Sequence, residues 1–264
     1  MRPCDYTGMN RLKMYFDRNV LRQKGLAQMA DDIFIGGGGD AYGAPQLLLL
    51  DKSNRHGLVA GATGTGKTVT LQIMAEGVSK AGVPVFLSDV KGDLSGLAVA
   101  GSADFKLHAA FMTRAQTIGL DLQYDSFPVT FWDLFGQQGH PIRATVAEMG
   151  PLLLSRLMEL TDVQEGVLNV AFRVADEQGL PLLDLKDLQA LLVWVGQNAS
   201  ELSLRYGNVA ASSVGAIQRQ LLVLENQGGT ALFGEPALEL SDLMRTRADG
   251  KGEINILAAD QLMG

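Results

Sequence analysis

The chain has 264 residues, of which 47% are hydrophobic and 19% are charged, and its formal net charge is −7. This length suits one large domain or two small ones, and it buries enough surface to fold without disulfides or a structural metal. A single cysteine, Cys4, excludes an intrachain disulfide and fits a reducing compartment such as the cytoplasm. No apolar run reaches the roughly 18 residues of a membrane span, so we expect no membrane insertion.

Charge is unevenly distributed along the chain. Residues 1–28 contain six basic and two acidic side chains, so the remainder is strongly acidic. This stretch lacks the apolar segment and cleavage site of a secretory signal. We therefore expect residues 1–28 to be a disordered leader or a start-site extension, with Met29 as an alternative start, and we expect the functional domain to span residues 29–264.

The first half of this domain has the pattern of a βαβ unit. Residues 33–35 lead into the glycines at 36–39, which we expect to form a flexible connector, and 47–50 is a short apolar run. Residues 56–60 predict a buried strand, 69–80 a helix and 83–87 a second strand. This order implies an α/β fold with a parallel sheet covered by helices.

The second half is largely helical. A strand is predicted at 129–132, helices at 151–161 and 163–177, and a final strand at 253–258. Asp184 is placed to cap a helix with one apolar face, and Ser212 or Ser213 to open another that Gly228 closes. We expect this helical segment, at about 145–228, to be an insertion. The apolar face after Asp184 consists of Leu185, Leu188, Leu191, Leu192 and Val195.

A glycine-rich motif stands between the first predicted strand and the first predicted helix. Residues 61–68 match the phosphate-binding pattern G-x-x-x-x-G-K-[ST] at every fixed position. Glycine allows the backbone to turn successive N–H groups toward an anion, and the following helix directs its positive end to the same place. The residues expected to contact the nucleotide are Gly61, Ala62, Thr63, Gly64, Thr65, Gly66, Lys67, Thr68 and Val69.

Two side chains of this motif have expected chemical roles. Lys67 is positioned to reach the β- and γ-phosphates of ATP as a point charge. The Thr68 hydroxyl is the expected ligand of Mg²⁺, which prefers oxygen donors and keeps several waters. The motif therefore predicts ATP and Mg²⁺ as ligands.

Asp89 is the next candidate, because it follows the second predicted strand. The carboxyl ends of parallel strands form the ligand crevice of an open sheet. Asp89 could hold Mg²⁺ through water, orient an attacking water or bond the glycine-rich loop, and a polar turn explains it equally well. A strand that ends in Asp followed by a catalytic Glu is missing, because the strand at 253–258 leads to Asp260 and then Gln261.

The spacing of the other residues does not identify a metal site or a further catalytic residue. His56, His108 and His140 are too scattered for a metal site, and one cysteine excludes a zinc ribbon. Several arginines are candidates for a contact made in trans, and no spacing selects one: Arg143, Arg156, Arg173, Arg205 and Arg219.

The sequence resembles the bacterial HerA-like ATPases, in the FtsK–HerA branch of P-loop motors. The resemblance rests on Arg55-His56-Gly57-Leu58 before the loop and on residues 83–94 after it. It continues through later motifs to cover about 33–264: Phe131 to Phe135, Gly139 to Arg143, Arg205 to Asn208, Phe233 to Pro236, and Ile254 to Asp260. It implies a RecA-like core that binds ATP and Mg²⁺, commonly in hexameric rings that act on DNA.

One departure from this family bears on activity. The acidic strand with the catalytic Glu comes later in such proteins, so we expect the chain to be the front part of a longer ATP hydrolase, incomplete at its C-terminus. Two other functions remain open. A P-loop kinase would need a lid with clustered arginines, and a nucleotide-dependent switch or assembly module would bind ATP without turnover.

Overall fold

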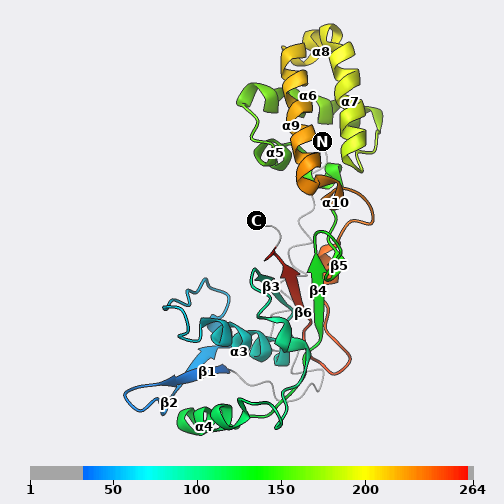
Figure 1. Ribbon diagram of the computed structural model, residues 1–264. Coiled ribbons are helices and arrows are strands. Elements are labelled where there is room, and N and C mark those ends of the chain that lie inside the picture. The colour runs from blue at the N-terminus through cyan, green and yellow to red at the C-terminus, as the bar shows by residue number, and fades with distance from the viewer. Residues whose placement is uncertain (1–31, 261–264) are drawn as a thin grey trace. The chain divides into compact units, whose positions relative to one another are not determined.

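The structure, a computed structural model, describes residues 32–260 (Figure 1). The expected leader at 1–28, the alternative start at Met29 and Gln261 lie outside the described residues. The chain divides into two compact units. The first comprises Met1–Ala81 with Ser102–Gln123, and the second comprises Gly82–Gly101 with Tyr124–Gly264.

The first unit contains a hairpin where the sequence suggested a flexible connector. Strand β1 (Asp32–Gly38) pairs antiparallel with β2 (Ala44–Leu49), and Gly36 to Gly38 belong to the ladder. The prediction of a connector was wrong because Gly37, which has no Cβ, lets the Tyr42 carbonyl approach the strand. A 3₁₀ turn, η1 (Leu50–Lys52), follows, and the unit's helices are α3 (Lys67–Lys80) and α4 (His108–Ile118).

The prediction of a strand at 56–60 is wrong. The segment has no strand hydrogen bonds, and Leu58 is 90% exposed. An apolar run becomes a strand only when a partner strand satisfies its backbone, and none of the described strands pairs with it. The helix predicted at 69–80 is confirmed as α3, which begins two residues earlier.

The second unit contains the parallel sheet. Its strands β3 (Val85–Asp89), β4 (Val129–Asp133), β5 (His140–Pro141) and β6 (Ile254–Ala258) lie in the order β3-β6-β4-β5. Every pair is parallel, which confirms the predicted parallel sheet. Ala258 pairs with Asp89 on one side and Asp133 on the other, so both aspartates lie in one row at the carboxyl ends of the strands.

Strand β6 is central and buried on both faces, which suits its apolar sequence. Its one polar residue, Asn255, is fully buried and hydrogen-bonded. The Asn255 Oδ1 accepts from Trp132 Nε1 at 2.9 Å, and its Nδ2 donates to the Leu243 carbonyl at 3.0 Å. This pairing joins β4 and the 3₁₀ turn η4 (Leu240–Leu243) to the central strand. A further 3₁₀ turn, η2 (Ser95–Ala98), follows β3.

The long helical segment is confirmed. It consists of α5 (Val146–Leu157), α6 (Asp162–Gln178), α7 (Leu185–Gln197), α8 (Ala199–Tyr206), α9 (Ala211–Leu224), the π-turn η3 (Glu225–Gly229) and the short α10 (Thr230–Leu232). The predicted cap Asp184 accepts the Lys186 and Asp187 N–H groups at 2.8 and 3.0 Å. The start predicted at Ser212 or Ser213 is wrong, because α9 begins at Ala211 without a side-chain cap.

The helical segment has its own core and a narrow attachment to the sheet. The incoming chain at Ala144 donates to Leu232 at 2.9 Å and accepts from Gly234 at 3.0 Å. Arg143 Nη1 also donates to the Glu235 carbonyl at 2.7 Å. The segment therefore leaves and rejoins the sheet at one place. Its core is mainly aliphatic and includes Leu154, Leu168, Leu185, Leu188, Leu192, Ile217 and Leu221.

The π-turn touches the loop that follows β4, and this contact gives a testable prediction. Gly228 has φ +92°, and a Cβ there would lie 2.9 Å from Cε1 of Phe135. We expect Gly228→Ala to lower the free energy of unfolding by roughly 1–3 kcal/mol. Gly166 lies within α6 with open space around it, so Gly166→Ala should instead stabilise by about 0.5–1 kcal/mol. Urea unfolding of both variants checks the difference, and an equal effect at the two sites would contradict it.

Candidate functional site

The loop at 61–68 needs glycine for two different reasons. Gly64 and Gly66 have φ of +81° and +93°, in the left-handed region that favours glycine. Gly61 is required by a close approach instead, because a Cβ there would lie 2.5 Å from the Thr65 Oγ1. Thr65 Oγ1 in turn donates to the Ala62 carbonyl at 2.8 Å. The loop is thus a tight turn, stabilised by a hydrogen bond within it, that leads directly into α3.

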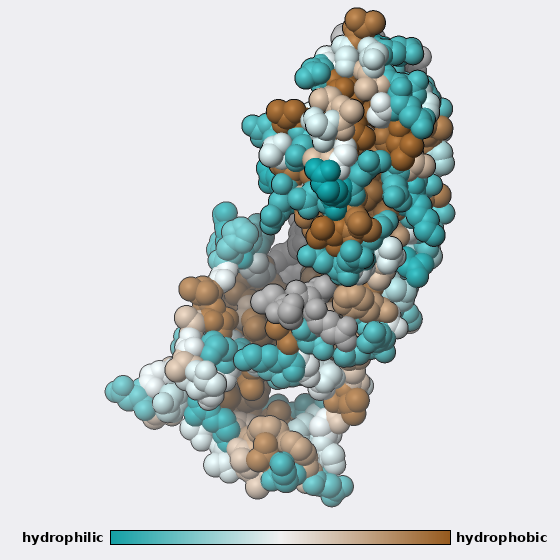
Figure 2. All heavy atoms as spheres, turned by 45° about the horizontal axis from the view of Figure 1, so that its top comes forward, coloured by the Kyte–Doolittle hydropathy of each residue, from teal (hydrophilic) through white to brown (hydrophobic). Residues whose placement is uncertain are grey.

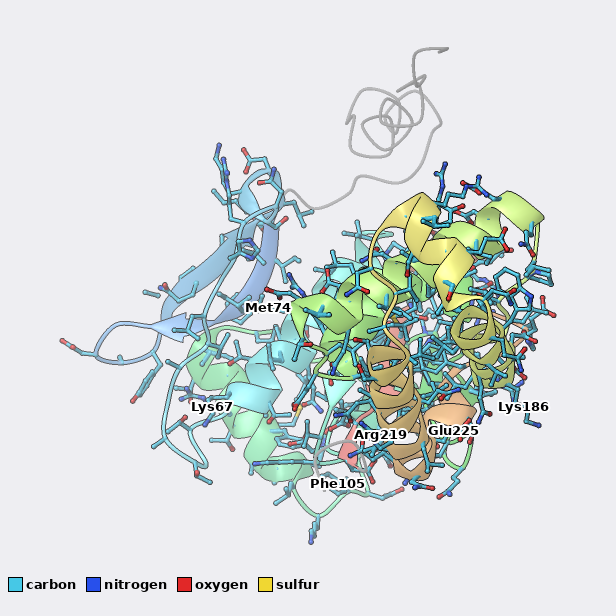
Figure 3. The ribbon with its side chains drawn as sticks, turned by 90° about the horizontal axis from the view of Figure 1, so that it is seen from above. Lys67, Met74, Phe105, Lys186, Arg219 and Glu225 are labelled. Carbon is cyan, nitrogen blue, oxygen red and sulfur yellow. The ribbon has the colours of Figure 1, made fainter. Side chains whose placement is uncertain are left out.

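Lys67 lies at the start of α3 (Figure 3), and its side chain folds back over this loop. Its Nζ donates to the carbonyls of Gly61 and Ala62, both at 2.8 Å. These bonds hold the ammonium group against the backbone turn. A positive charge therefore lies at the loop, and its contact with the β- and γ-phosphates stays a prediction.

The N-terminus of α3 adds to the positive potential of the loop. The helix begins at Lys67, and Gly66 at the N-cap position offers it no side chain. Thr68 and Val69 lie in the first turn, where backbone N–H groups point out of the helix. Such an end attracts anions through its partial positive charge. Lysine, glycine turn and helix end thus occur together in the first unit.

Asp89 ends β3, and its carboxylate is used by its own turn. Oδ1 accepts the N–H groups of Lys91 at 3.1 Å and Gly92 at 2.8 Å, and Oδ2 accepts that of Leu94 at 3.0 Å. The side chain is buried, with 6% exposure. Three of its roughly four acceptor positions are therefore occupied by backbone donors. The geometry supports the polar-turn interpretation of Asp89, and its contact with Mg²⁺ stays a prediction.

Asp133 has the same arrangement at the end of β4, and it is not among the site residues predicted from the sequence. Its Oδ1 accepts from the Phe135 N–H at 2.9 Å, and Oδ2 accepts from Gln137 and Gln138 at 2.7 and 2.8 Å. Burial alone would raise the pKa of Asp133, but these three donors stabilise the charged form and lower its pKa below the usual value. A signal was present in the sequence, because an apolar strand ends in Asp before a glycine-containing turn in both places.

Asp260 completes the acidic residues at this edge of the sheet. It follows β6, and its Oδ2 accepts from Gln138 Nε2 at 3.4 Å. The loop after β4 is thus fixed at its start by Asp133 and linked at Gln138 to the residue that follows β6. The second unit therefore presents two strand ends, those of β3 and β4, whose loops are held by carboxylates.

Of the five candidate arginines, three have defined partners. Arg173 and Arg205 form ion pairs with Glu177, each at 2.7 Å, and Arg143 bonds the attachment of the helical segment. The Tyr206 hydroxyl donates to Glu177 at 2.6 Å, and this bond, followed by the one from Arg173, lowers the pKa of Glu177. The same bond to Glu177 raises the pKa of Tyr206. Arg205 and Tyr206, from one of the later motifs, thus join α8 to α6.

Two further properties concern the described part of the chain. Between residues 32 and 260, no three His, Cys, Asp or Glu side chains gather in a way that would hold a metal ion. Over the same residues, no helix combines the length and the apolar character needed to cross a bilayer.

Comparison with known proteins identifies the family. The family described as helicase HerA-like C-terminal matches residues 38–264, which include the loop at 61–68 and all strands of the parallel sheet. No curated protein matches the chain. A match over most of the chain, on an α/β fold with a four-stranded parallel sheet flanked by helices, confirms the resemblance carried by its motifs. The chain is therefore a member of the helicase HerA-like C-terminal family.

Proposed function

We propose that the chain binds ATP with Mg²⁺ at the loop of residues 61–68, as a P-loop NTPase with a RecA-like core. The observation that carries this proposal is the position of the Lys67 ammonium, 2.8 Å from two carbonyls of a glycine turn at the start of a helix. A lysine, a left-handed glycine turn and an uncapped helix end are complementary to a polyphosphate. Family membership supports an ATPase or helicase-related role for the chain.

Each residue of the loop has a part in this proposal. Backbone N–H groups of the turn and of the first turn of α3 bind phosphate oxygens. Lys67 exchanges its two carbonyl partners for phosphate oxygens, which are stronger acceptors because they are charged. The Thr68 hydroxyl is a hard oxygen donor suited to Mg²⁺, which when bound neutralises phosphate charge. The fit is favourable, because every donor lies within one short segment.

Asp89 and Asp133 are proposed as positioning residues. Their carboxylates hold the loops after β3 and β4 at the edge where open parallel sheets bind ligands. Each carboxylate fixes a backbone turn of the second unit through three hydrogen bonds.

The wider activity is proposed from the family. Coupling ATP hydrolysis to DNA translocation or processing in a ring assembly is the function that a HerA-like family member suggests. The acidic balance of the chain argues against tight DNA binding by a single copy, because phosphate neutralisation dominates such affinity. A ring could still collect basic side chains along one pore. DNA-stimulated ATP hydrolysis is the activity that measures this part of the proposal.

The test of nucleotide recognition compares ATP, ADP and AMP. Competition against a fluorescent ATP analogue should give an affinity order of ATP and ADP well above AMP, because Lys67 and the loop contact the outer phosphates. Mg²⁺ should strengthen ATP binding more in the native chain than in Thr68→Ala. Equal affinity for AMP and ATP would overturn the assignment of the loop. Binding without hydrolysis, with or without DNA, would favour the switch over the motor.

A further inference from the structure

The second half of helix α5 is apolar on its outward side as well as on its buried side. The helix is broken at Gly150, whose φ is +71°, and its last turns follow Pro151. Leu154 and Met158 are buried in the core of the helical segment. On the opposite side of these turns, across an arc of about 140°, three leucines and one arginine are exposed. In order around the helix they are Leu152, Arg156, Leu153 and Leu157.

These leucines continue into the start of α6. Each of the three is about half exposed, and Val163, in the first turn of α6, is 62% exposed. Residues 158–161 join the end of α5 to the start of α6, and the two helices pack together. Neighbouring exposed apolar side chains of this size are typical of a surface that another protein covers.

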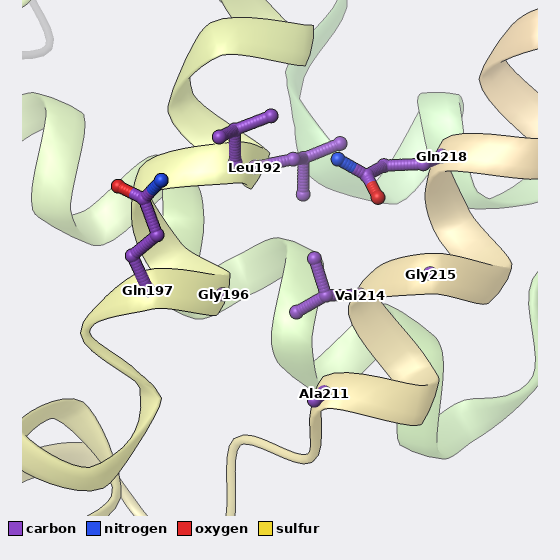
Figure 4. A pocket seen from close by; sticks show the side chains of 8 residues that line it. Leu192, Gly196, Gln197, Ala211, Val214, Gly215 and Gln218 are labelled. Carbon is purple, nitrogen blue, oxygen red and sulfur yellow. The ribbon is translucent and has the colours of Figure 1, made fainter.

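Other surfaces of the helical segment are interrupted by polar residues. A groove of about 400 Å³ lies between α7 and α9, where Gln197 and Gln218 line it beside Leu192 and Val214 (Figure 4). Hydrophobic and hydrophilic residues also alternate over the segment in the space-filling view (Figure 2). The outward side of α5 differs, because Arg156 is the one polar side chain among its four residues.

The charged residues around the leucines carry both signs. Arg156 lies among them, Glu159 lies in the turn that follows, and Asp162 begins α6. All three are exposed, and none of them forms an ion pair within the part of the chain that the structure describes. A surface with both signs beside its apolar residues is complementary to a copy of itself, whereas a uniformly basic or acidic partner would leave one sign unmatched.

The backbone of Glu159 is a second, independent observation. Its φ is +51°, in the left-handed region where glycine is usual at a helix end. Backbone groups alone close this turn, because the Leu160 N–H donates to the Ser155 carbonyl at 2.8 Å and the Glu159 N–H to the Arg156 carbonyl at 3.2 Å. Glycine would form the same turn without strain. The local fold therefore does not account for a glutamate here, and a contact made by its carboxylate outside the chain would.

We propose that the outward side of α5 and the first turn of α6 bind the same surface of a second copy of this chain across a two-fold axis. The leucines of the two copies pack together, and Arg156 of each copy lies opposite Glu159 of the other, with Asp162 beside it. Negative charge elsewhere on each chain opposes this contact only weakly, because charges more than about 8–10 Å apart are screened at physiological salt. A two-fold contact closes at two copies, so it is separate from the proposed ring and from nucleotide binding.

The first test is the dependence of mass on concentration. Sedimentation equilibrium of the full chain should show a dimer that dissociates on dilution, and Leu153→Glu should raise its dissociation constant at least tenfold. Leu204→Glu introduces the same side chain at a leucine of α8 that is 91% exposed, and it should leave the dimer unchanged. Circular dichroism verifies that both variants are folded. A chain that stays monomeric at the highest concentration would assign the surface to a different partner and overturn the proposal, as would an assembly of any size that Leu153→Glu leaves unchanged.

The second test exchanges the paired charges. Arg156→Glu and Glu159→Arg each place like charges opposite one another in a pair of identical chains, so each variant alone should dimerise at least fivefold more weakly than the native chain. An equimolar mixture of the two should recover the dimer, because opposite charges then face each other at both places. Glu159→Arg also lowers the net negative charge, so general repulsion alone would predict a stronger dimer for it. That result, or a mixture no stronger than its components, would refute the two-fold pairing.

Discussion

Lys67→Ala is expected to weaken ATP binding at least tenfold and to abolish ATP hydrolysis wherever the native chain supports it. The Lys67 ammonium is held at the loop by two carbonyls at 2.8 Å, so it is preorganised to meet an anion there. A hydrogen bond to a charged group is typically worth about 1.5–3 kcal/mol, and its loss lowers affinity tenfold or more. Titration with a fluorescent ATP analogue measures the loss of affinity.

Two control variants make this result specific. Lys52→Ala removes an exposed lysine of the same unit that pairs with Asp51, and it should leave ATP affinity unchanged. Lys67→Arg keeps the charge but not the shape, because a planar guanidinium does not replace a compact ammonium. It should retain only part of the affinity. If Lys67→Ala binds ATP as tightly as the native chain, the loop is not the nucleotide site.

Asp133→Asn is expected to lower the free energy of unfolding by roughly 1–3 kcal/mol at neutral pH. The amide can still accept from one or two backbone donors, but its NH₂ group faces the N–H groups of Gln137 and Gln138 that Oδ2 now satisfies. These donors then lose their partner. Asp40→Asn, at an exposed position of the first unit, is the matched control and should leave stability unchanged.

The pH dependence of this variant follows from the pKa of Asp133. Its folded-state pKa is lowered, so its stabilising contribution is fully present above the unfolded pKa of about 4 and disappears as the pH falls through the folded value. The stability difference between native chain and Asp133→Asn should therefore shrink in acid. Urea unfolding between pH 7 and pH 3 measures it, and a difference that grows in acid would contradict the assignment.

Much of the fold could be predicted because local patterns and long-range packing agree in it. Asp184 caps α7, the leucines behind it are buried, and the strands at 129–132 and 253–258 occur within one residue of their predicted bounds. Each has an apolar face with a clear period and a polar residue at its end. For these elements the sequence pattern predicts which face is buried.

The errors share a different physical cause. Residues 56–60 are as apolar as a typical buried strand. Whether they form one depends on a partner strand, which the local sequence does not identify. The hairpin of β1 and β2 depends on the approach of the Tyr42 carbonyl to Gly37, which no periodicity reveals. The order β3-β6-β4-β5 likewise places the last strand in the centre, and only the assembled sheet shows that.

The candidate site was predictable in part for the same reason. The loop at 61–68 is contiguous, so its spacing alone identified Lys67 and Thr68. Asp133 is separated from Asp89 by more than forty residues, and only the register with Ala258 shows that they occupy one row. A sequence motif identifies only residues that are close together in the chain. Residues that come together from distant segments are found only in the folded structure.

The attachment of the helical segment has a consequence for modular design. Ala144 and Gly234 are hydrogen-bonded neighbours at 3.0 Å, so the two ends of a long excursion meet. Exchanging residues 145–231 for a short glycine linker should leave the order of the sheet intact, since closing a short loop costs little chain entropy. The helical segment, which contains its own aliphatic core, is in this sense an interchangeable module. A different segment could be inserted at this position without a change in the order of the strands.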